Sequence, residues 1–471
     1  MERLTASDAW FLYVEGPTLP VHVTGLLILD PATSPTGFSF SGLRQHIAGR
    51  LDVTPELRRR LVEVPLAIDH PCWIEDPAFD LDQHVHHLVL SRADPTTELA
   101  RFIGEFVSSR LDRTRPLWDL VVVEGLDDGR FAVIVKMHHC EVDGVSGLGI
   151  LEHLLELSPT PEHRDPPPRV EAERLPSVTE VLAAATWNRV TDPLRPVRAA
   201  VDAARSLWQV GGTTIRRRRI GADPVAHPLN APRTSFNSSM SAERVVAFGR
   251  APLEDLKTIR RAFDVTINDV VLAACTHALR DYMACHDLLP VRPLVCSVPC
   301  STHGHDDRDL SSNQVSNMFV NLPVQVADPL AQLRMVHAGS CGAKEVQESV
   351  GANMISDLVE IVPPSMIHLA MRLYSESGLV DRVPPIHNLI VSNVMGSPVP
   401  MYLAGSKVVG LHAFGPLMLG AGLNITVLSH DGDIGIGLTA CPDVIADIDE
   451  LLEDLLGGIA VLLEAAGRLA V

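Results

Sequence analysis

The sequence predicts an α/β fold built from two blocks that a helical connector joins. Strand-like and helix-like apolar runs alternate in the first third of the chain and again in its second half. Hydrophobic residues make up 46% of the 471 residues, which is enough for a sizeable core. No short-period repeat occurs, which argues against solenoids and propellers. We therefore expect a first domain over residues 1–176, a connector over 177–243 and a second domain over 244–471.

The first block combines strand-like and helical runs that end in a hairpin. Its strand-like runs are continuous apolar stretches, and its helical runs repeat apolar residues at helical spacing. In chain order these runs are Val21–Leu29, Leu43–Leu51, Thr97–Leu111, Leu120–Glu124 and Phe131–Met137. Asp128-Gly129 lies between the last two runs and is a strong turn signal, so we expect these two runs to pair as a β-hairpin.

The connector and the second block follow. Ser158–Pro176 holds six prolines among charged residues, which predicts a linker or a long surface crossover. Val178–Gln209 regains helical character, and a polar loop then continues to about Glu243. The elements expected beyond it are helices over Ala251–Ala262 and Ile267–Cys285, strands over Leu294–Val298, Met318–Val326, Leu389–Ser392, Gly422–Val427 and Ile434–Thr439, and an amphipathic helix over Leu451–Val471.

Charge and cysteine usage exclude several classes of protein. The net charge is −19, from 39 basic and 58 acidic residues, which argues against a nucleic-acid binder. None of the eight cysteines forms a CxxC pair or a zinc-ribbon spacing. The N-terminus lacks the pattern of a signal peptide, and no apolar run is long enough to span a bilayer. We therefore expect a cytoplasmic protein.

The sharpest local feature is the run His138-His139-Cys140-Glu141-Val142-Asp143-Gly144, directly after the hairpin. Adjacent strand residues point to opposite faces, so His138 and His139 are badly placed to bind one ion, and we expect no metal site. The same geometry lets one imidazole open into a cavity and take a proton from a hydroxyl. Asp143 can anchor the turn, and Gly144 permits a tight backbone conformation. A purely structural histidine pair explains these residues equally well.

The pattern His-His-x-x-x-Asp-Gly resembles the signature of the CoA-dependent acyltransferase superfamily, which includes chloramphenicol acetyltransferase and the condensation domains of peptide synthetases. The chain resembles one branch in particular, the bacterial wax ester synthase/diacylglycerol acyltransferase family. Five further matches occur in order over nearly the whole length. They are Leu4–Leu12 with Glu15 and Pro20–Val23, Pro116-Leu117-Trp118, Ile267–Val270, Ser392-Asn393-Val394 with Gly396, and Gly422–Thr426. This ordered set is far more specific than the histidine motif alone.

The resemblance implies a fold of two chloramphenicol-acetyltransferase-like domains with mixed sheets and an active-site channel at their interface. It also implies an O-acyltransferase that moves a long-chain fatty acyl group from acyl-CoA to the hydroxyl of diacylglycerol or of a fatty alcohol. The products would be triacylglycerol or a wax ester. In this interpretation His139 is the general base, and His138, Asp143 and Gly144 support it. Acyl-CoA is a co-substrate, no bound cofactor is expected, and no acyl-enzyme forms.

Four residues are assigned to the substrate channel from the same resemblance: Asn268, Asp269, Ser392 and Asn393. Each also has a structural interpretation. Asn268 stands where the N-cap of a helix is expected, just before Asp269. Ser392 and Asn393 end a strand, where their side chains can satisfy a turn. The two kinds of role can coexist, because a cap or a turn can also line a cavity wall.

Rival functions stay open at this point. One is an enzyme of the same superfamily that acylates a polyketide or glycolipid alcohol, another is a low-activity lipid-binding paralogue, and a third is a metal-dependent hydrolase. The expected partners are acyl-CoA and a lipid alcohol, with no nucleic acid. Any contact with the inner face of the plasma membrane or with lipid inclusions would be peripheral. Arg216–Arg219 and Leu194–Trp208 could attract phosphates or dock on an interface, although ordinary solvated helices show the same patterns.

Overall fold

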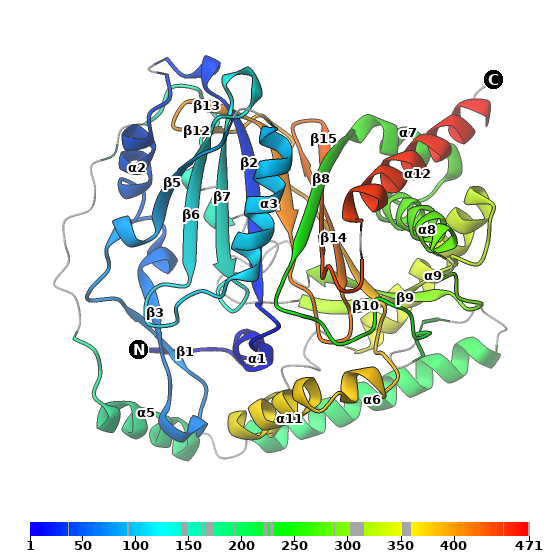
Figure 1. Ribbon diagram of the computed structural model, residues 1–471. Helices are drawn as coiled ribbons and strands as arrows, with labels where there is room; N and C mark the ends of the chain where they lie inside the picture. The colour runs from blue at the N-terminus through cyan, green and yellow to red at the C-terminus, as the bar shows by residue number, and fades with distance from the viewer. Residues whose placement is uncertain are drawn as a thin grey trace.

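Two six-stranded sheets stand side by side in the computed structural model of the chain (Figure 1). A smaller sheet of three strands, β1 (Glu2–Arg3), β3 (Arg59–Val62) and β4 (Cys72–Glu75), accompanies them. The residues that the structure describes are 1–35, 37–91, 94–142, 149–151, 153–162, 164, 174–191, 195–219, 225–226, 230–286, 288–301, 315–350, 359–445 and 447–469.

The N-terminal sheet has the strand order β12-β13-β2-β7-β6-β5. Its strands are β2 (His22–Asp30), β5 (Val85–Val89), β6 (Trp118–Glu124), β7 (Phe131–His138), β12 (Tyr402–Leu403) and β13 (Ser406–Phe414). β5 and β6 run parallel, and the other neighbouring pairs are antiparallel. Helices cover both faces: α2 (Phe40–Ala48) shares a hydrophobic cluster with Leu27 and Leu29, whereas α3 (Pro95–Ser108) shares one with Leu26. Neighbouring strand residues point to opposite faces, so β2 is apolar on both.

The C-terminal sheet has the strand order β10-β9-β11-β14-β15-β8. Its strands are β8 (Val245–Pro252), β9 (Leu294–Ser301), β10 (Val315–Leu322), β11 (Leu389–Val394), β14 (Leu423–His430) and β15 (Asp433–Ala440). β11 runs parallel to both β9 and β14, and the remaining pairs are antiparallel. Two mixed sheets with helices on their faces confirm the predicted fold class.

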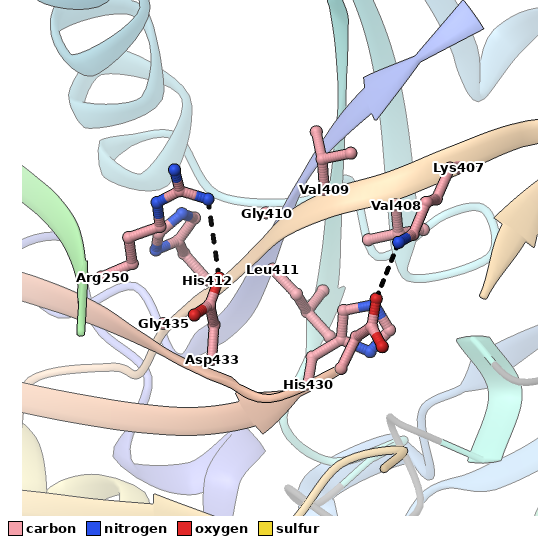
Figure 2. A pocket seen from close by; sticks show the side chains of 11 residues that line it. Arg250, Lys407, Val408, Val409, Gly410, Leu411, His412, His430, Asp433 and Gly435 are labelled. Carbon is pink, nitrogen blue, oxygen red and sulfur yellow. Dashed lines mark ion pairs between the residues drawn. The ribbon is translucent and has the colours of Figure 1, made fainter. Parts of the chain in front are cut away.

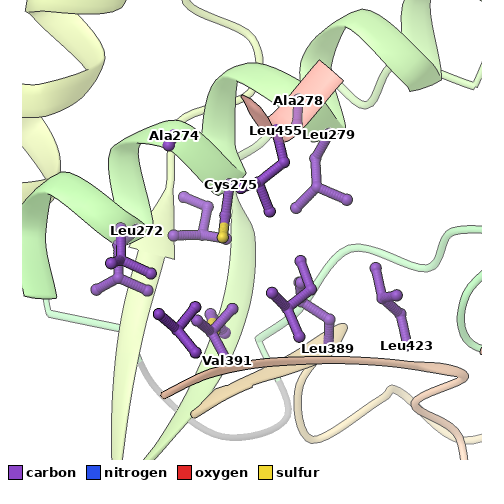
Figure 3. Packing of buried hydrophobic residues seen from close by; sticks show 14 of the residues in the cluster. Leu272, Ala274, Cys275, Ala278, Leu279, Leu389, Val391, Leu423 and Leu455 are labelled. Carbon is purple, nitrogen blue, oxygen red and sulfur yellow. The ribbon is translucent and has the colours of Figure 1, made fainter. Parts of the chain in front are cut away.

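The largest hydrophobic core lies between the C-terminal sheet and its helices, α7 (Leu253–Phe263), α8 (Ile267–Cys285), α9 (Pro329–Val350) and α12 (Ile448–Leu469). Figure 3 shows Cys275 and Leu279 of α8 above Leu389 of β11 and Leu423 of β14, with Leu455 of α12 beside them. All five side chains are buried. Each large apolar side chain buried in this way contributes about 1.5–3 kcal/mol, so α8 is held mainly by this packing.

One strand of the N-terminal sheet comes from the far end of the chain. β13 pairs antiparallel with β2, and it also contacts β14 and β15 of the other sheet. Gly435 and Gly437 on β15 allow this crossing, because a Cβ there would collide with the carbonyl oxygens of Leu411 and Ala413 on β13. The proposed division of the chain at residues 176 and 243 stays a prediction, and it did not anticipate this shared strand.

Most of the expected elements occur with small shifts at their ends. The hairpin forms as β6 and β7, and its turn residues Asp128 and Gly129 have positive φ values of 58° and 70°. α8 has the predicted bounds, and α12 packs its apolar face on the body. β10 ends at Leu322, before the expected Val326, because Pro323 cannot donate to the ladder. Most of the expected linker Ser158–Pro176 lies outside the described residues.

Three helices lie along one edge of the molecule in Figure 1: α5 (Val178–Thr191), α6 (Arg195–Arg219) and α11 (Pro364–Glu376). Arg216–Arg219 forms the last turn of α6, so helix continues well past the expected end at Gln209. The short helix α1 (Ala6–Val14) contacts α11. Within the described segments no single helix is long and apolar enough to cross a membrane, and only the pair α7 and α8, bent by 100°, reaches that length and composition together.

Candidate active site

The histidine pair stands at the end of β7. The N–H of His138 donates to the carbonyl of Leu117 at 2.9 Å, and the N–H of His139 donates to that of Val21 at 3.0 Å. Opposite His138 in the register lies His22 of β2. The side chain of His138 is buried, with 1% exposure, whereas His139 is only half-buried. The two imidazoles therefore occupy different environments, as expected for neighbours on a strand.

The ring of His139 stacks on Phe11 of α1. The two ring centroids are 3.9 Å apart, and the ring planes differ by 12°. Such a stack restricts the rotation of the imidazole. The Nδ1 atom of the ring is buried. α1 is positioned by its own cap, in which the Thr5 side chain accepts from the N–H of Asp8. The N-terminal helix therefore orients the ring that the sequence proposes as the base.

A buried cluster of charged and titratable groups surrounds His138. Glu15, directly after α1, is 2% exposed at its side chain. Its Oε1 lies 3.4 Å from Nε2 of His138 and 3.4 Å from Nε2 of His22. Its Oε2 accepts from Nη2 of Arg113 at 2.6 Å. We call Glu15, His22, Arg113 and His138 the Glu15 cluster.

Ionisation within the Glu15 cluster is set by these contacts. Burial alone would raise the pKa of Glu15, but hydrogen bonding by His138 and His22 and the charge of Arg113 hold that pKa well below its usual range. Burial lowers the pKa of His22 to about 4 and also lowers the pKa of His138. At neutral pH the cluster therefore contains one carboxylate, one guanidinium and two neutral imidazoles.

Glu15, His22 and His138 also have the spacing of a metal site, since their ligand atoms lie within 4.8 Å of one another. The tautomer of His138 opposes that interpretation. The N–H of Cys140 donates to Nδ1 of His138 at 3.0 Å, so the neutral ring carries its proton on Nε2. A protonated Nε2 can donate to Glu15 but cannot bind a metal ion. We infer a hydrogen-bonded charge cluster, and the expectation of no metal stays a prediction.

Glu141 is a second buried carboxyl group close to the pair. It is 7% exposed, and both of its carboxyl oxygens are buried without a hydrogen-bond partner within the part of the chain that the structure describes. Burial raises the pKa of Glu141 to about 8. Its side chain is therefore mostly protonated at neutral pH. Asp143 and Gly144, the other proposed support residues, lie outside the described residues.

Asn268 and Asp269 lie in the first turn of α8, in the C-terminal block. The N-cap of α8 is Thr266 and not Asn268, so the expected cap was wrong by two residues. Thr266 has the extended backbone that a cap needs, and Asp269 three residues later completes a capping box with it. The carboxylate of Asp269 also accepts from Nδ1 of His337 on α9 at 2.8 Å. These contacts join α8 to α9 rather than to the histidine pair, and a channel role for both residues stays a prediction.

Ser392 and Asn393 are half-buried at the end of β11. The next residue, Val394, packs against the same hydrophobic cluster as Val142, which follows the histidine pair by three positions. The end of β11 and the turn after β7 are thus brought to one cluster from opposite blocks. This placement agrees with a channel wall, but the proposed role itself stays a prediction.

A pocket of about 290 Å³ lies elsewhere, on β13 and the turn between β14 and β15 (Figure 2). Lys407 pairs with Asp431 at 2.9 Å, and Arg250 pairs with Asp433 at 3.5 Å, so its charges are balanced. The β13 register places this pocket beside the half of β2 that is remote from the histidine pair. It is not the predicted channel.

Two family models match the chain. The wax ester synthase/diacylglycerol acyltransferase catalytic domain matches residues 4–271, and the C-terminal domain of the same family matches residues 311–462. The chain belongs to this family. The match confirms the family resemblance and the expectation of an acyltransferase. The catalytic-domain match covers both the histidine pair and the Glu15 cluster.

Known proteins of this family resemble the chain over almost its full length. A Mycobacterium tuberculosis protein that carries the name diacylglycerol O-acyltransferase is 35% identical over 449 residues, which is 95% of this chain and 87% of the relative. The solved wax ester synthase/diacylglycerol acyltransferase of Marinobacter aquaeolei VT8 is 26% identical, with a TM-score of 0.69, and 99% of this chain and 100% of that one are covered.

Condensation domains share the fold at lower identity. The first condensation domain of the calcium-dependent antibiotic synthetase is 18% identical, with a TM-score of 0.58 over 99% of this chain and 96% of that one. The starter condensation domain of rhizomide synthetase, solved with C8-CoA and Leu-SNAC, is 14% identical, with a TM-score of 0.56 over 99% and 94%. At these identities the likeness concerns the fold alone.

Within this family member, the sequence did not identify Glu15, His22 and Arg113 as site residues. They come from three separate segments, and only the fold joins them to His138. One signal was present: a lone glutamate follows an apolar helix and precedes an apolar strand that contains a histidine. A charged residue between two buried elements is seldom buried unless it has a partner.

Proposed function

We propose that this chain moves a long-chain fatty acyl group from acyl-CoA to the hydroxyl of diacylglycerol or of a fatty alcohol, with His139 as the general base. The observation that carries the proposal is the half-buried imidazole of His139, stacked on Phe11 directly beside the buried Glu15 cluster. Family membership supports the reaction type.

The reaction needs one proton carrier and no covalent enzyme intermediate. The acceptor oxygen attacks the thioester carbonyl carbon while His139 takes the hydroxyl proton. The tetrahedral adduct then collapses, the carbon–sulfur bond breaks, and the imidazolium gives its proton to the CoA thiolate. An ester and free CoA leave. Cys140 is not a candidate nucleophile, because burial raises the pKa of its thiol well above the usual value.

The Glu15 cluster would position the base rather than exchange protons with the substrate. His138 is joined to His139 by a peptide bond, and Glu15 and Cys140 hold its ring from opposite sides. A fixed strand end restricts where the His139 ring can lie, as an orienting carboxylate does in other acid–base sites. We further propose that Asp143 and Gly144 support the turn.

The proposal also places a substrate channel between the two blocks. Asn268, Asp269, Ser392 and Asn393 would line it from the C-terminal block, opposite the strand end that carries His139. Because the acceptor is a lipid, we expect a cytoplasmic protein that works at the inner face of the plasma membrane or at lipid inclusions.

The test is an acceptor panel with radiolabelled palmitoyl-CoA. Purified protein is given diacylglycerol, hexadecanol or a glycolipid, and labelled esters are separated by thin-layer chromatography. We expect triacylglycerol or wax ester from the wild type and about 10²–10⁴-fold slower ester formation from His139→Ala. The matched control is His277→Ala, which removes another partly exposed histidine, paired with Asp281 on the surface of α8.

Two outcomes would contradict the proposal. Wild-type turnover by a folded His139→Ala would exclude the general base, and the absence of ester with every acceptor would favour a lipid-binding paralogue. Ester formation with the glycolipid alone would favour the rival substrate class.

A further inference from the structure

Two of the eight cysteines, Cys285 and Cys341, are exposed to solvent, and the other six are buried or half-buried. Burial raises the pKa of thiols such as those of Cys275 and Cys296, which makes them poor nucleophiles at neutral pH. The two exposed thiols are open to small reagents. They differ in the groups that surround them.

Cys341 faces a histidine on the same helix. It lies on α9 four residues after His337, a spacing that places both side chains on one face of the helix. The Sγ atom of Cys341 is 3.9 Å from Nε2 of His337. The side chain of His337 is 37% exposed, so thiol and imidazole both reach the surface. An imidazole at this position can take the proton of the thiol as the sulfur attacks an electrophile.

Asp269 fixes the tautomer of His337. Its Oδ2 atom lies 2.8 Å from Nδ1 of His337, and a carboxylate oxygen only accepts, so Nδ1 carries a proton. Burial would raise the pKa of Asp269, but hydrogen bonds with His337 and Thr266 lower it. The hydroxyl and the N–H of Thr266 donate to the same Oδ2 at 2.8 and 2.9 Å. In the neutral ring the lone pair therefore lies on Nε2, the atom that faces Cys341.

Cys285 shows what an exposed cysteine of this chain lacks without such partners. It is the last residue of α8, and His286 follows it directly. The Nδ1 atom of His286 donates to the carbonyl of Tyr282 at 2.7 Å, and its ring stacks on the ring of the same tyrosine. Among the described residues the Cys285 side chain has no hydrogen-bond partner. A neighbouring histidine in the sequence is thus not enough to supply a base.

The charges close to Cys341 balance one another. Arg217 of α6 lies against Gly342, the next residue of α9, and pairs with Glu345 at 2.6 Å. Lys344, in the same turn, is exposed. Because the guanidinium already has a carboxylate partner, we attribute the activation of the thiol to His337.

We propose that Cys341 is a modification site, where the thiol forms mixed disulfides with small disulfides, His337 acts as the base and Asp269 positions that base. The Cys341 sulfur attacks one sulfur of the disulfide while His337 takes the thiol proton. The new S–S bond forms, the old one breaks, and the leaving thiolate receives the proton from the imidazolium. Cys341 is oxidised, and half of the reagent is reduced to a thiol.

A disulfide suits this site better than a thioester. Attack on a thioester carbonyl creates an oxyanion, which needs a placed donor, whereas exchange between sulfur atoms needs an accessible thiol and its base. An exposed helix face provides both. The proposal does not depend on acyl transfer, because the reaction at Cys341 involves neither His139 nor acyl-CoA.

The test is mixed-disulfide formation with glutathione disulfide at neutral pH, followed on the full chain by mass spectrometry of its peptides. In the wild type we expect the adduct at Cys341 to form about tenfold faster than the adduct at Cys285. His337→Gln removes the base and should slow Cys341 to the rate of Cys285. The matched control is His286→Gln, which should leave both rates unchanged. In urea the two cysteines of the wild type should react at equal rates.

Asp269→Asn tests the positioning residue. An amide can donate to Nδ1 and so favours the tautomer with the proton on Nε2, which cannot act as a base. The rate at Cys341 should fall while the rate at Cys285 stays the same. The adduct at the buried Cys275 monitors unfolding of each variant, so rates are compared only where Cys275 stays unmodified.

Three results would overturn the proposal. Equal rates at Cys341 and Cys285 in the folded wild type would mean that Cys341 is an ordinary thiol. A fast Cys341 that His337→Gln leaves unchanged would mean that exposure alone explains the rate. An unchanged rate in folded Asp269→Asn would remove the carboxylate from the site.

Discussion

Two buried glutamates on either side of the histidine pair have opposite charge states. Glu15 precedes the sheet and contacts His22, His138 and Arg113, which hold its pKa well below the usual range despite burial. Glu141 follows the pair, and its carboxyl oxygens have no hydrogen-bond partner among the described residues, so burial raises its pKa to about 8. The comparison shows that partners, rather than burial alone, decide whether a carboxyl group near this site is ionised.

Replacing Glu15, the ionised glutamate, should have the largest effect on stability and turnover. Glu15→Gln leaves the partly buried Arg113 with the exposed Glu63 as its remaining acidic partner, so we expect the free energy of unfolding to fall by about 3 kcal/mol. Turnover per folded molecule should also fall, because His138 loses the group that fixes it. Urea unfolding and acyl transfer, measured where both proteins are folded, check these effects.

The control for Glu15→Gln is Glu156→Gln, which breaks another buried pair, with Arg50. This variant should lose stability and keep its turnover per folded molecule. If both variants lost turnover equally, the Glu15 cluster would have no special role at the site.

Glu141, the neutral glutamate, should make the stability of the protein depend on pH. Because the folded pKa of Glu141 lies above its unfolded value of 4.5, the folded state holds a proton that the unfolded state releases. Its contribution is present in full below pH 4.5 and is lost as the pH rises through about 8, by about 1.4 kcal/mol for each unit. Thermal melts across this range should fall less steeply for Glu141→Gln than for the wild type. Parallel curves would mean that Glu141 is ionised in the folded protein.

Asp269 is a third buried carboxylate, which caps helix α8 and pairs with His337. Burial would raise its pKa, but hydrogen bonds with His337 and Thr266 lower it. Asp269→Asn should cost about 1 kcal/mol of unfolding free energy, the usual value of a helix cap. The loss should shrink as the pH falls through the folded pKa, where the wild-type carboxylate takes up a proton. If urea unfolding showed that Asp269→Asn loses as much unfolding free energy as Glu15→Gln, this smaller role would be contradicted.

Local signals were enough for much of the fold. Asp128-Gly129 between two apolar runs predicts the hairpin of β6 and β7, and a long stripe of apolar residues at helical spacing predicts α8. The cap of α8 was misplaced because two polar residues near its start, Thr266 and Asn268, both suit a cap. Only the backbone geometry, extended at Thr266, decides between them.

Contacts between distant segments were beyond sequence reasoning. β13 pairs with β2, and neither strand carries a pattern that specifies the other. The Glu15 cluster likewise joins residues that are far apart in the sequence, at positions 15, 22, 113 and 138. The motif predicted the location of the histidine pair but not the groups behind it, because no local spacing links Arg113 to Glu15.

The most direct test of the central claim is chemical rescue of His139→Ala by imidazole. The variant should transfer acyl groups about 10²–10⁴-fold more slowly than the wild type, the range expected when a general base is removed. Added imidazole should restore part of that rate in proportion to its concentration, and it should leave the wild type unchanged. A folded His139→Ala that turns over at the wild-type rate without imidazole would contradict the assignment.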